Sequence, residues 1–186
     1  MVRSFRPVLH QSWFLPVLLV AIAGAGSWKF ACITPFVAFA VAAPYALPPR
    51  TALFTVAAVW LVNQGIGFEI LGYPWTIDTM LWGIAIGAAA LAAAGVAAAV
   101  LQLGVRNRIT AVGAAFVPAF AIYQGGLLLA GFALGGRDDF TPAIVGQVAL
   151  LNFVWLLGLV GTCEILRCAG AFITRRRSGF SPSFPI

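Results

Sequence analysis

Charged residues are scarce in this chain: only 9% of its 186 residues are Asp, Glu, Lys or Arg, whereas 62% are hydrophobic. A soluble domain normally carries about 25% charged residues, and the mean hydropathy here is +1.00. This composition excludes a soluble globular domain of any size and predicts an all-α integral membrane protein. Strands are not expected, because the apolar runs are continuous and do not alternate with polar residues.

Histidine, cysteine and acidic residues are also few, which limits the chemistry that the chain can perform. There are one histidine, three cysteines and five carboxylates. We find no Ser-His-Asp set, no zinc-protease or P-loop motif and no dinucleotide glycine motif. The sequence therefore predicts a protein that is not an enzyme and has no cofactor or metal site. A membrane enzyme that uses Cys163, Glu164 or Glu69 is the least favoured alternative.

Six apolar runs separated by short breaks make up nearly all of the chain. We expect them to form six transmembrane helices at about residues 13–28, 30–47, 51–71, 77–103, 109–134 and 142–165. Four of the runs have the roughly 20 residues that a bilayer requires, and the first two are shorter. The expected organisation is a single six-helix membrane domain over residues 1–173, followed by a basic, disordered cytoplasmic tail over residues 174–186.

The placement of basic residues agrees with six spans. One side of the expected topology receives both termini and the links near residues 50 and 106, and with them nine of the arginines: Arg3, Arg6, Arg50, Arg106, Arg108, Arg167, Arg175, Arg176 and Arg177. Because basic residues stay on the cytoplasmic side, both termini are expected in the cytoplasm of a plasma (inner) membrane. The net charge of +6 therefore reflects orientation in the lipid bilayer, and no nucleic acid partner is expected.

Small residues gather on one face of the first run and one face of the fourth. Ala21 and Ala25 are four residues apart, as are Gly83 and Gly87, so each pair shares a helix face. Small residues let helix backbones approach closely in lipid, where hydrophobicity does not drive helices together. The two pairs predict either packing inside the bundle or docking of a partner subunit, and all four residues are candidates for partner docking.

The segment 63–78 interrupts the apolar pattern more strongly than any other. Asn63 and Gln64 lie inside an apolar run, where an unsatisfied amide is costly. Tyr73 and Trp75 carry amphipathic rings that the membrane–water boundary favours. The segment predicts either a helix end with an aromatic belt and a solvated loop, or the lip of a small-molecule pocket.

Polar residues within the third, fifth and sixth runs share one depth in the expected topology, between the membrane centre and its outer boundary. Scattered amides are commonly interhelical hydrogen bonds worth about 0.6 kcal/mol each. Their common depth favours a cavity that opens outward and holds a flat organic ligand. The aromatic rings beside them are Trp60, Phe68, Tyr73, Trp75, Trp82 and Trp155. The candidate ligand-binding residues are Asn63, Gln64, Glu69, Tyr73, Trp75, Asp78, Tyr123, Gln124, Gln147 and Asn152. No line of charges crosses the expected membrane, which counts against an ion channel or a proton relay.

In its size, its six short spans with both termini inside and its Ala21-x-x-x-Ala25 face, the chain resembles the substrate-binding S components of energy-coupling factor vitamin transporters. The resemblance implies that the first helices present the alanine face to a transmembrane coupling subunit, which works with separate ATPases. It also implies that the outer loops and the last three helices enclose a vitamin. We therefore expect a transporter or capture subunit that binds a small organic nutrient, such as a vitamin or cofactor precursor, in the outer half of the bundle. The alternative is a non-catalytic assembly or structural subunit of a larger membrane complex.

Overall fold

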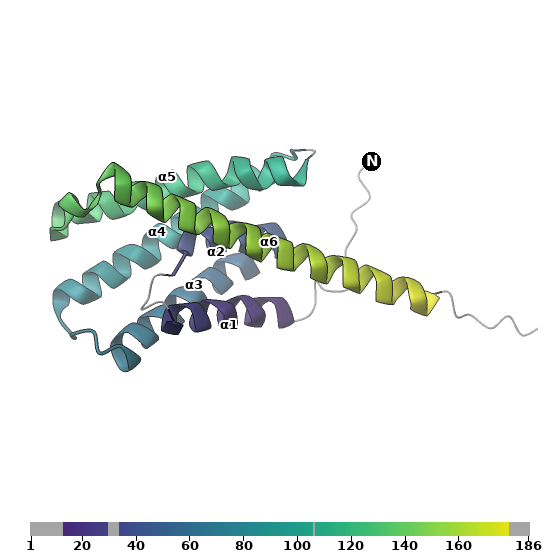
Figure 1. Cartoon of the computed structure of the whole chain (residues 1–186), viewed down its shortest axis with the longest axis horizontal. Helices are drawn as coiled ribbons and strands as arrows, with labels where there is room; N and C mark the ends of the chain where they lie inside the picture. Colours follow the sequence, from purple (N-terminus) through teal and green to yellow (C-terminus); the bar gives the residue numbers. More distant parts are fainter. Residues whose placement is uncertain (1–12, 30–33, 106, 179–186) are drawn as a thin grey trace, which may run out of the picture.

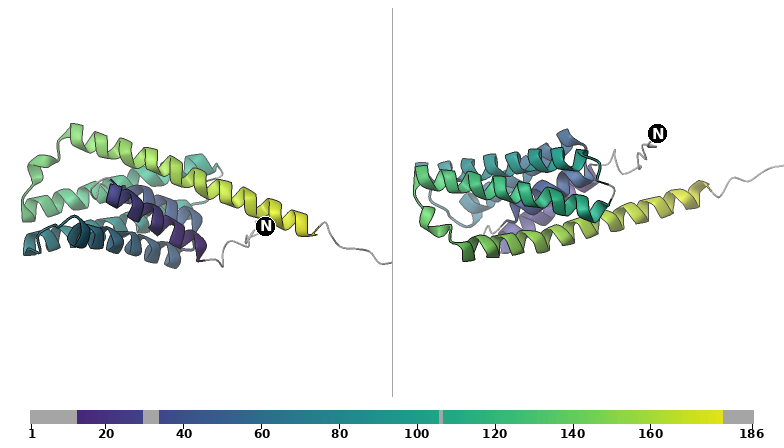
Figure 2. Two further views of the ribbon diagram at one scale, coloured as in Figure 1. Left: turned by 60° about the horizontal axis from the view of Figure 1, so that its bottom comes forward. Right: turned by 90° about the horizontal axis from the view of Figure 1, so that it is seen from above.

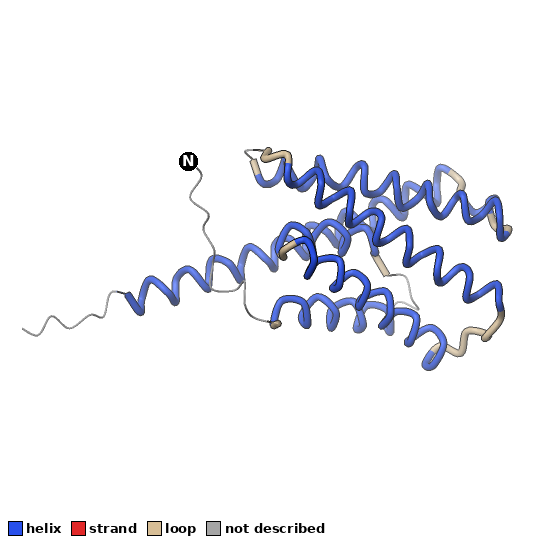
Figure 3. The backbone as a smooth tube through the Cα atoms, turned by 180° about the vertical axis from the view of Figure 1, so that it is seen from behind, coloured by secondary structure: helices blue, strands red, loops and turns tan. Residues whose placement is uncertain are grey.

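The computed structural model describes residues 13–29, 34–105 and 107–178, with the backbone alone for residues 139 and 170–178. Every regular element within these ranges is a helix, as Figure 3 shows, so the predicted all-α fold is confirmed. In chain order the elements are α1 (Phe14–Lys29), α2 (Phe36–Ala46), α3 (Pro49–Gly65), the π-helix η2 (Ile66–Ile70), α4 (Ile77–Gln102), α5 (Arg108–Leu134), the 3₁₀-helix η3 (Arg137–Asp139) and α6 (Pro142–Ser178).

Four helical segments are long and apolar enough to cross a membrane: Pro49–Ile70, Ile77–Gln102, Arg108–Leu134 and Pro142–Ala169. Many of their large apolar side chains are exposed on the surface of the bundle, which is the arrangement that contact with lipid requires. The chain is therefore a multi-pass membrane protein. Helices α1 and α2 are also apolar, but their 16 and 11 residues fall short of the roughly 20 that a span normally needs.

Local signals in the sequence set the ends of the long helices. Helix α3 begins with a proline in its first turn, where the missing N–H costs nothing. Thr76 caps α4 by accepting a hydrogen bond from the N–H of Thr79 at 3.2 Å, and Asn107 caps α5 in the same manner. Helix α5 is followed by Gly135 and Gly136, whose φ angles of 88° and 91° are readily adopted by glycine alone.

Helix α2 lies at the centre of the bundle. Every residue from 36 to 43 is buried, and the helix packs against α3, α4, α5 and α6. Helix α1 lies against α3 on the outside, and α6 crosses the other helices at an angle (Figures 1 and 2). Because α2 begins only at Phe36, well inside the bundle, the longer helices around it extend past its first turn.

The third and fourth helices approach each other closely at two glycines. A Cβ added at Gly83 would lie 2.5 Å from Oε1 of Gln64, and one added at Gly87 would lie 2.6 Å from the ring of Trp60. Nε1 of Trp60 also donates a hydrogen bond of 2.8 Å to the carbonyl oxygen of Gly83. The assignment of Gly83 and Gly87 to a partner-docking surface is wrong, because contacts with α3 bury both.

The alanine pair on α1 faces away from the bundle. Helix α1 buries the opposite face, which carries Leu19 and Ala23. Ala21 and Ala25 are exposed, and Val17 on the same face is 61% exposed. The two alanines therefore remain accessible to lipid or to another helix.

Two predicted boundaries differ from the structure. The prediction of a helix from residue 30 to residue 47 is wrong for its first part, because α2 begins at Phe36; residues 30–33 lie outside the described ranges. A proline disfavours helical geometry in the residue before it, so Pro35 explains why Thr34 is not helical. Helix α6 continues to Ser178, into the segment predicted as a disordered tail, and residues 179–186 lie outside the described ranges.

The two ends of the bundle carry different connections, as Figure 1 shows. The α3–α4 and α5–α6 connections, together with Thr34 before α2, lie at one end, here named the cavity end. The α2–α3 and α4–α5 connections lie at the other, here named the arginine end after Arg50, Arg108 and Arg167. Helix α6 projects beyond its neighbours at the arginine end (Figure 2).

One carboxylate joins three helices at the arginine end. Glu164 on α6 accepts hydrogen bonds from the hydroxyl of Tyr45 on α2 and from Arg167, the latter at 2.7 Å. Arg108 on α5 forms an ion pair with the same carboxylate at 3.1 Å. The guanidinium of Arg167 also donates to the carbonyl oxygen of Tyr45 at 3.0 Å and lies 4.8 Å from the centre of its ring. These contacts hold the end of α2 between α5 and α6.

Candidate functional site

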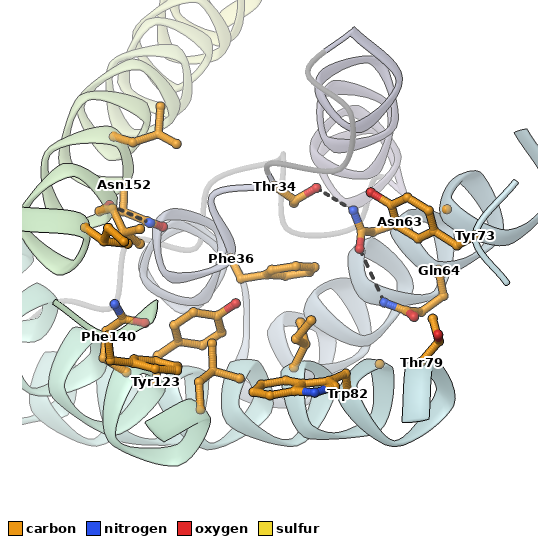
Figure 4. A pocket seen from close by; sticks show the side chains of 18 of the residues that line it. Thr34, Phe36, Asn63, Gln64, Tyr73, Thr79, Trp82, Tyr123, Phe140 and Asn152 are labelled. Carbon is orange, nitrogen blue, oxygen red and sulfur yellow. Dashed lines mark hydrogen bonds between the residues drawn. The ribbon is translucent and has the colours of Figure 1, made fainter. Parts of the chain in front are cut away.

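A cavity of about 470 Å³ lies beyond the first turn of α2, at the cavity end (Figure 4). Its volume falls within the range of small-molecule pockets. All the long helices contribute to its wall, together with η2 and the three connections at this end. The lining residues are Thr34, Phe36, Asn63, Gln64, Gly67, Phe68, Tyr73, Thr79, Trp82, Gly83, Ile86, Tyr123, Gln124, Leu127, Phe140, Ile144, Val145, Val148, Leu151 and Asn152.

Six of the ten predicted ligand-binding residues line this cavity. They are Asn63, Gln64, Tyr73, Tyr123, Gln124 and Asn152. The structure does not bring the other four to the wall. Glu69, Asp78 and Gln147 are exposed, and Trp75 stacks on the outer side of Phe68 with ring centres 4.3 Å apart.

Asn152 acts mainly as a cap for α2. Its Oδ1 accepts hydrogen bonds from the N–H groups of Val37 at 3.0 Å and Ala38 at 3.2 Å, and its Nδ2 donates to the carbonyl oxygen of Val148 at 2.9 Å. The first N–H groups of a helix have no partner within the helix, and leaving them unpaired in a membrane costs several kcal/mol. The side chain of Asn152 on α6 therefore makes the buried start of α2 possible. A predominant role of this amide in ligand binding is not supported.

A second polar cluster joins α1, Thr34 and α3 beside the cavity. Nδ2 of Asn63 donates to Oγ1 of Thr34 at 2.7 Å and to Oγ of Ser27 at 3.2 Å, and these two hydroxyls lie 2.6 Å apart. Nε2 of Gln64 donates to Oδ1 of Asn63 at 3.3 Å. Neutral hydrogen bonds thus join the end of α1, the end of α3 and Thr34, which lies two residues before α2.

Tyr123 differs from Asn63, Gln64 and Asn152, whose amides bond other residues of the chain. It is only 7% exposed, and its hydroxyl makes no hydrogen bond with any residue that the structure describes. The hydroxyl points into the cavity from α5, beside the ring of Phe36 (Figure 4). No buried side-chain polar atom among the described residues lacks a partner, so the Tyr123 hydroxyl is open to the cavity, where water or a ligand can pair with it.

Aromatic rings make up much of the remaining wall. Phe36 and Tyr123 have ring centres 6.3 Å apart, and Phe68, Trp82 and Phe140 line other parts of the cavity. The sequence indicated Phe68 and Trp82 as rings near the predicted pocket. It did not indicate Phe36 and Phe140, although the Thr34-Pro35 pair is a signal that a helix starts here.

No charged side chain lines the cavity among the residues whose side chains are described. Clusters of three or more His, Cys, Asp or Glu side chains that could hold a metal ion are also not found in the described ranges. The arrangement can therefore enclose a small molecule by contact with rings and by neutral hydrogen bonds. Among the described residues, the wall offers no acid, base or nucleophile apart from the hydroxyls of Thr34, Tyr73, Thr79 and Tyr123.

Comparison with known proteins gives no assignment: no protein-family model matches the sequence, and no curated protein or solved structure is significantly similar to it.

Proposed function

We propose that this protein captures a small organic nutrient from the outer side of the membrane, as a transporter or as the substrate-binding subunit of one. The observation that carries the proposal is the cavity of about 470 Å³ with the Tyr123 hydroxyl, which bonds no other described residue, directed into it. A wall of rings and neutral polar groups is typical of a site for a flat organic molecule. Six of the residues selected from the sequence for this function line the cavity.

The proposed topology has six spans, with α1 and α2 as short ones, both termini in the cytoplasm and the cavity end outside. The arginine end would then face the cytoplasm, as the rule on basic residues requires. In a cysteine-free background, Asp138→Cys should react from outside the cell with a membrane-impermeant thiol reagent. Leu103→Cys, which is exposed at the arginine end, should react only after the membrane is permeabilised. The reverse pattern would contradict the outward-facing cavity.

Binding should be detectable as an increase in thermal stability. A ligand that binds only the folded state stabilises it by about 2.7 kcal/mol at 100 times its dissociation constant. We expect at least one member of a panel of vitamins and cofactor precursors to raise the melting temperature of the protein purified in mild detergent. Ile144→Trp is the matched control, and the same ligand should raise its melting temperature less. Ile144 lines the cavity but is 43% exposed, so the larger ring can narrow the entrance without overpacking the core. A panel that shifts neither protein would contradict nutrient capture.

The likeness to S components further suggests a transmembrane coupling subunit as partner, with α1 as the contact. The exposed Ala21 and Ala25 support this proposal, because small residues permit close helix packing. Ala21→Leu should reduce co-purification of any partner without affecting stabilisation by ligand. Val117→Leu, at an exposed position of α5, should leave both unchanged.

The same alanine face favours the second candidate function, an assembly or structural subunit of a larger membrane complex. In that case one large complex would co-purify with the protein, Ala21→Leu would release it, and no small molecule would raise the melting temperature.

A further inference from the structure

We infer that the cavity selects an uncharged molecule with an aromatic ring system, which exchanges a hydrogen bond with the Tyr123 hydroxyl. The inference rests on the proposed capture function and specifies its substrate class. Three features support it. The wall offers an ion no partner of opposite charge, the amides of Asn63, Gln64 and Asn152 already bond other residues of the chain, and the Tyr123 hydroxyl is available to bond a ligand.

Ions are rejected because the wall offers them no partner. All the lining residues are neutral. Arg137, which lies within the α5–α6 connection, pairs with Asp138 at the surface. Removing a carboxylate or an ammonium group from water is expensive unless an opposite charge compensates for it. Ring faces attract cations, but this attraction is smaller than the cost of taking an ion out of water. A molecule without net charge avoids this cost.

The first turn of α2, at the floor of the cavity, provides no anion site either. Free N–H groups at the start of a helix commonly bind phosphate or carboxylate groups. Here the N–H of Phe36 donates to the carbonyl oxygen of Thr34 at 2.8 Å, and those of Val37 and Ala38 donate to Asn152. The donors that would attract an anion are therefore already occupied.

Tyr123 is the most buried polar side chain of the wall that makes no hydrogen bond with another described residue; Gln124 and Trp82, which also line the cavity, are half-buried. The side-chain amide of Asn63 donates hydrogen bonds to Ser27 and Thr34, and that of Gln64 donates one to Asn63. A phenol at ordinary pH is neutral and can both donate and accept one hydrogen bond. It therefore matches a carbonyl, amide or ring-nitrogen group of a neutral molecule.

The rings around this hydroxyl favour a flat partner. Phe36 lies beside Tyr123 at the floor, and Trp82 on α4 and Phe140 before α6 also line the cavity (Figure 4). Aromatic rings prefer offset-stacked or edge-to-face contact with one another, which adds to the gain from burying their area. An aromatic molecule can make such contacts here while one edge reaches Tyr123.

The test uses matched probes that share one ring system and differ in charge. One set is neutral nicotinamide, the nicotinate anion and the pyridinium cation 1-methylnicotinamide, and the other is riboflavin with riboflavin phosphate. Binding to the purified full chain is measured by thermal shift and by quenching of tryptophan fluorescence. The uncharged member of at least one set should bind about tenfold or more tightly than its charged partners. Tyr123→Phe should weaken that binding about three- to tenfold, as expected for one lost hydrogen bond.

Tyr123→Phe should leave the melting temperature of the ligand-free protein unchanged, because the hydroxyl has no partner among the described residues. Tyr45→Phe is the matched control at the arginine end: it removes a hydroxyl that bonds Glu164, so it should lower the melting temperature and leave probe affinity unchanged. Equal or tighter binding of a charged member, or an unaltered affinity in Tyr123→Phe, would overturn the inference while nutrient capture stands. If no probe binds and the wider vitamin panel also gives no shift, nutrient capture is overturned and this inference with it.

Discussion

The cavity end and the arginine end of the bundle join their helices by different means. At the cavity end, neutral amides and hydroxyls connect α1, α2, α3 and α6, with Asn63 and Asn152 as the two centres. At the arginine end, the Glu164 carboxylate connects α2, α5 and α6 through Tyr45, Arg108 and Arg167. The cavity end surrounds the cavity of about 470 Å³, whereas α2 ends at the arginine end in a set of charged contacts.

The difference follows from the cost of charge in a membrane. At the arginine end the charged groups are partly exposed, with 68% of the Arg108 side chain and 35% of the Glu164 side chain accessible, so they keep contact with water or lipid headgroups. At the cavity end Asn63 and Asn152 are 5% and 3% exposed, and an ion at such a site would be far more expensive. Neutral hydrogen bonds can therefore hold helices apart around an apolar space that a neutral ligand can enter.

The largest expected effect concerns the cap of α2 at the cavity end. Asn152→Ala leaves the N–H groups of Val37 and Ala38 without a partner, and each unsatisfied buried donor costs about 1–3 kcal/mol. We expect a loss of about 2–5 kcal/mol in the free energy of unfolding, measured by denaturant titration in detergent. Gln147→Ala, an exposed amide on the same helix, should have no measurable effect. Equal stability of the two variants would show that the cap is dispensable.

A smaller effect is expected between the two ends, where α3 and α4 touch. Gly87→Ala places a methyl group against the Trp60 ring, and overpacking of this kind typically costs about 1–3 kcal/mol. Gly95→Ala on the same helix meets nothing within 4 Å and should be neutral or slightly stabilising. Thermal unfolding of the two variants measures the difference. A stable Gly87→Ala would mean that α3 and α4 pack less closely than the structure shows.

The smallest effect is expected at the arginine end. Glu164→Ala removes an ion-pair network whose members are partly exposed, so we expect a cost of about 1 kcal/mol. High salt should reduce the cost, because screening weakens exposed charge pairs. Ligand binding at the cavity end should not change. Destabilisation by Glu164→Ala as large as that of Asn152→Ala would remove the energetic distinction between the two ends.

Composition and charge were sufficient to predict the helical membrane fold and most helix ends. Continuous apolar runs allow little else, and Pro49, Asn107 and Pro142 each lie at or next to the first residue of a long helix. The start of α2 was not predicted, because hydropathy stays high from residue 30 to residue 47 and only the Thr34-Pro35 pair signals the break. The glycines of α4 could not be assigned to internal packing, because a small-residue face looks the same whether it meets a helix of this chain or of another.

The candidate site was predicted in its location and only partly in the roles of its residues. A shared depth in the membrane indicated that Asn63, Tyr123 and Asn152 would lie near one another, and all three line the cavity. The sequence could not show that Asn152 is committed to the α2 backbone while Tyr123 is not. That distinction depends on interatomic distances between helices far apart in the chain. Glu69, Asp78 and Gln147 have the right chemistry and depth but lie on exposed surface.

The central claim is that the cavity holds a small, uncharged organic molecule. Native mass spectrometry of the protein purified from its membrane in mild detergent tests it most directly. We predict that the wild-type chain carries one small organic molecule, that its identified form has no net charge, and that Ile144→Trp carries much less of it. A wild-type chain that carries only phospholipid, or that has the mass of the bare polypeptide, would contradict the account.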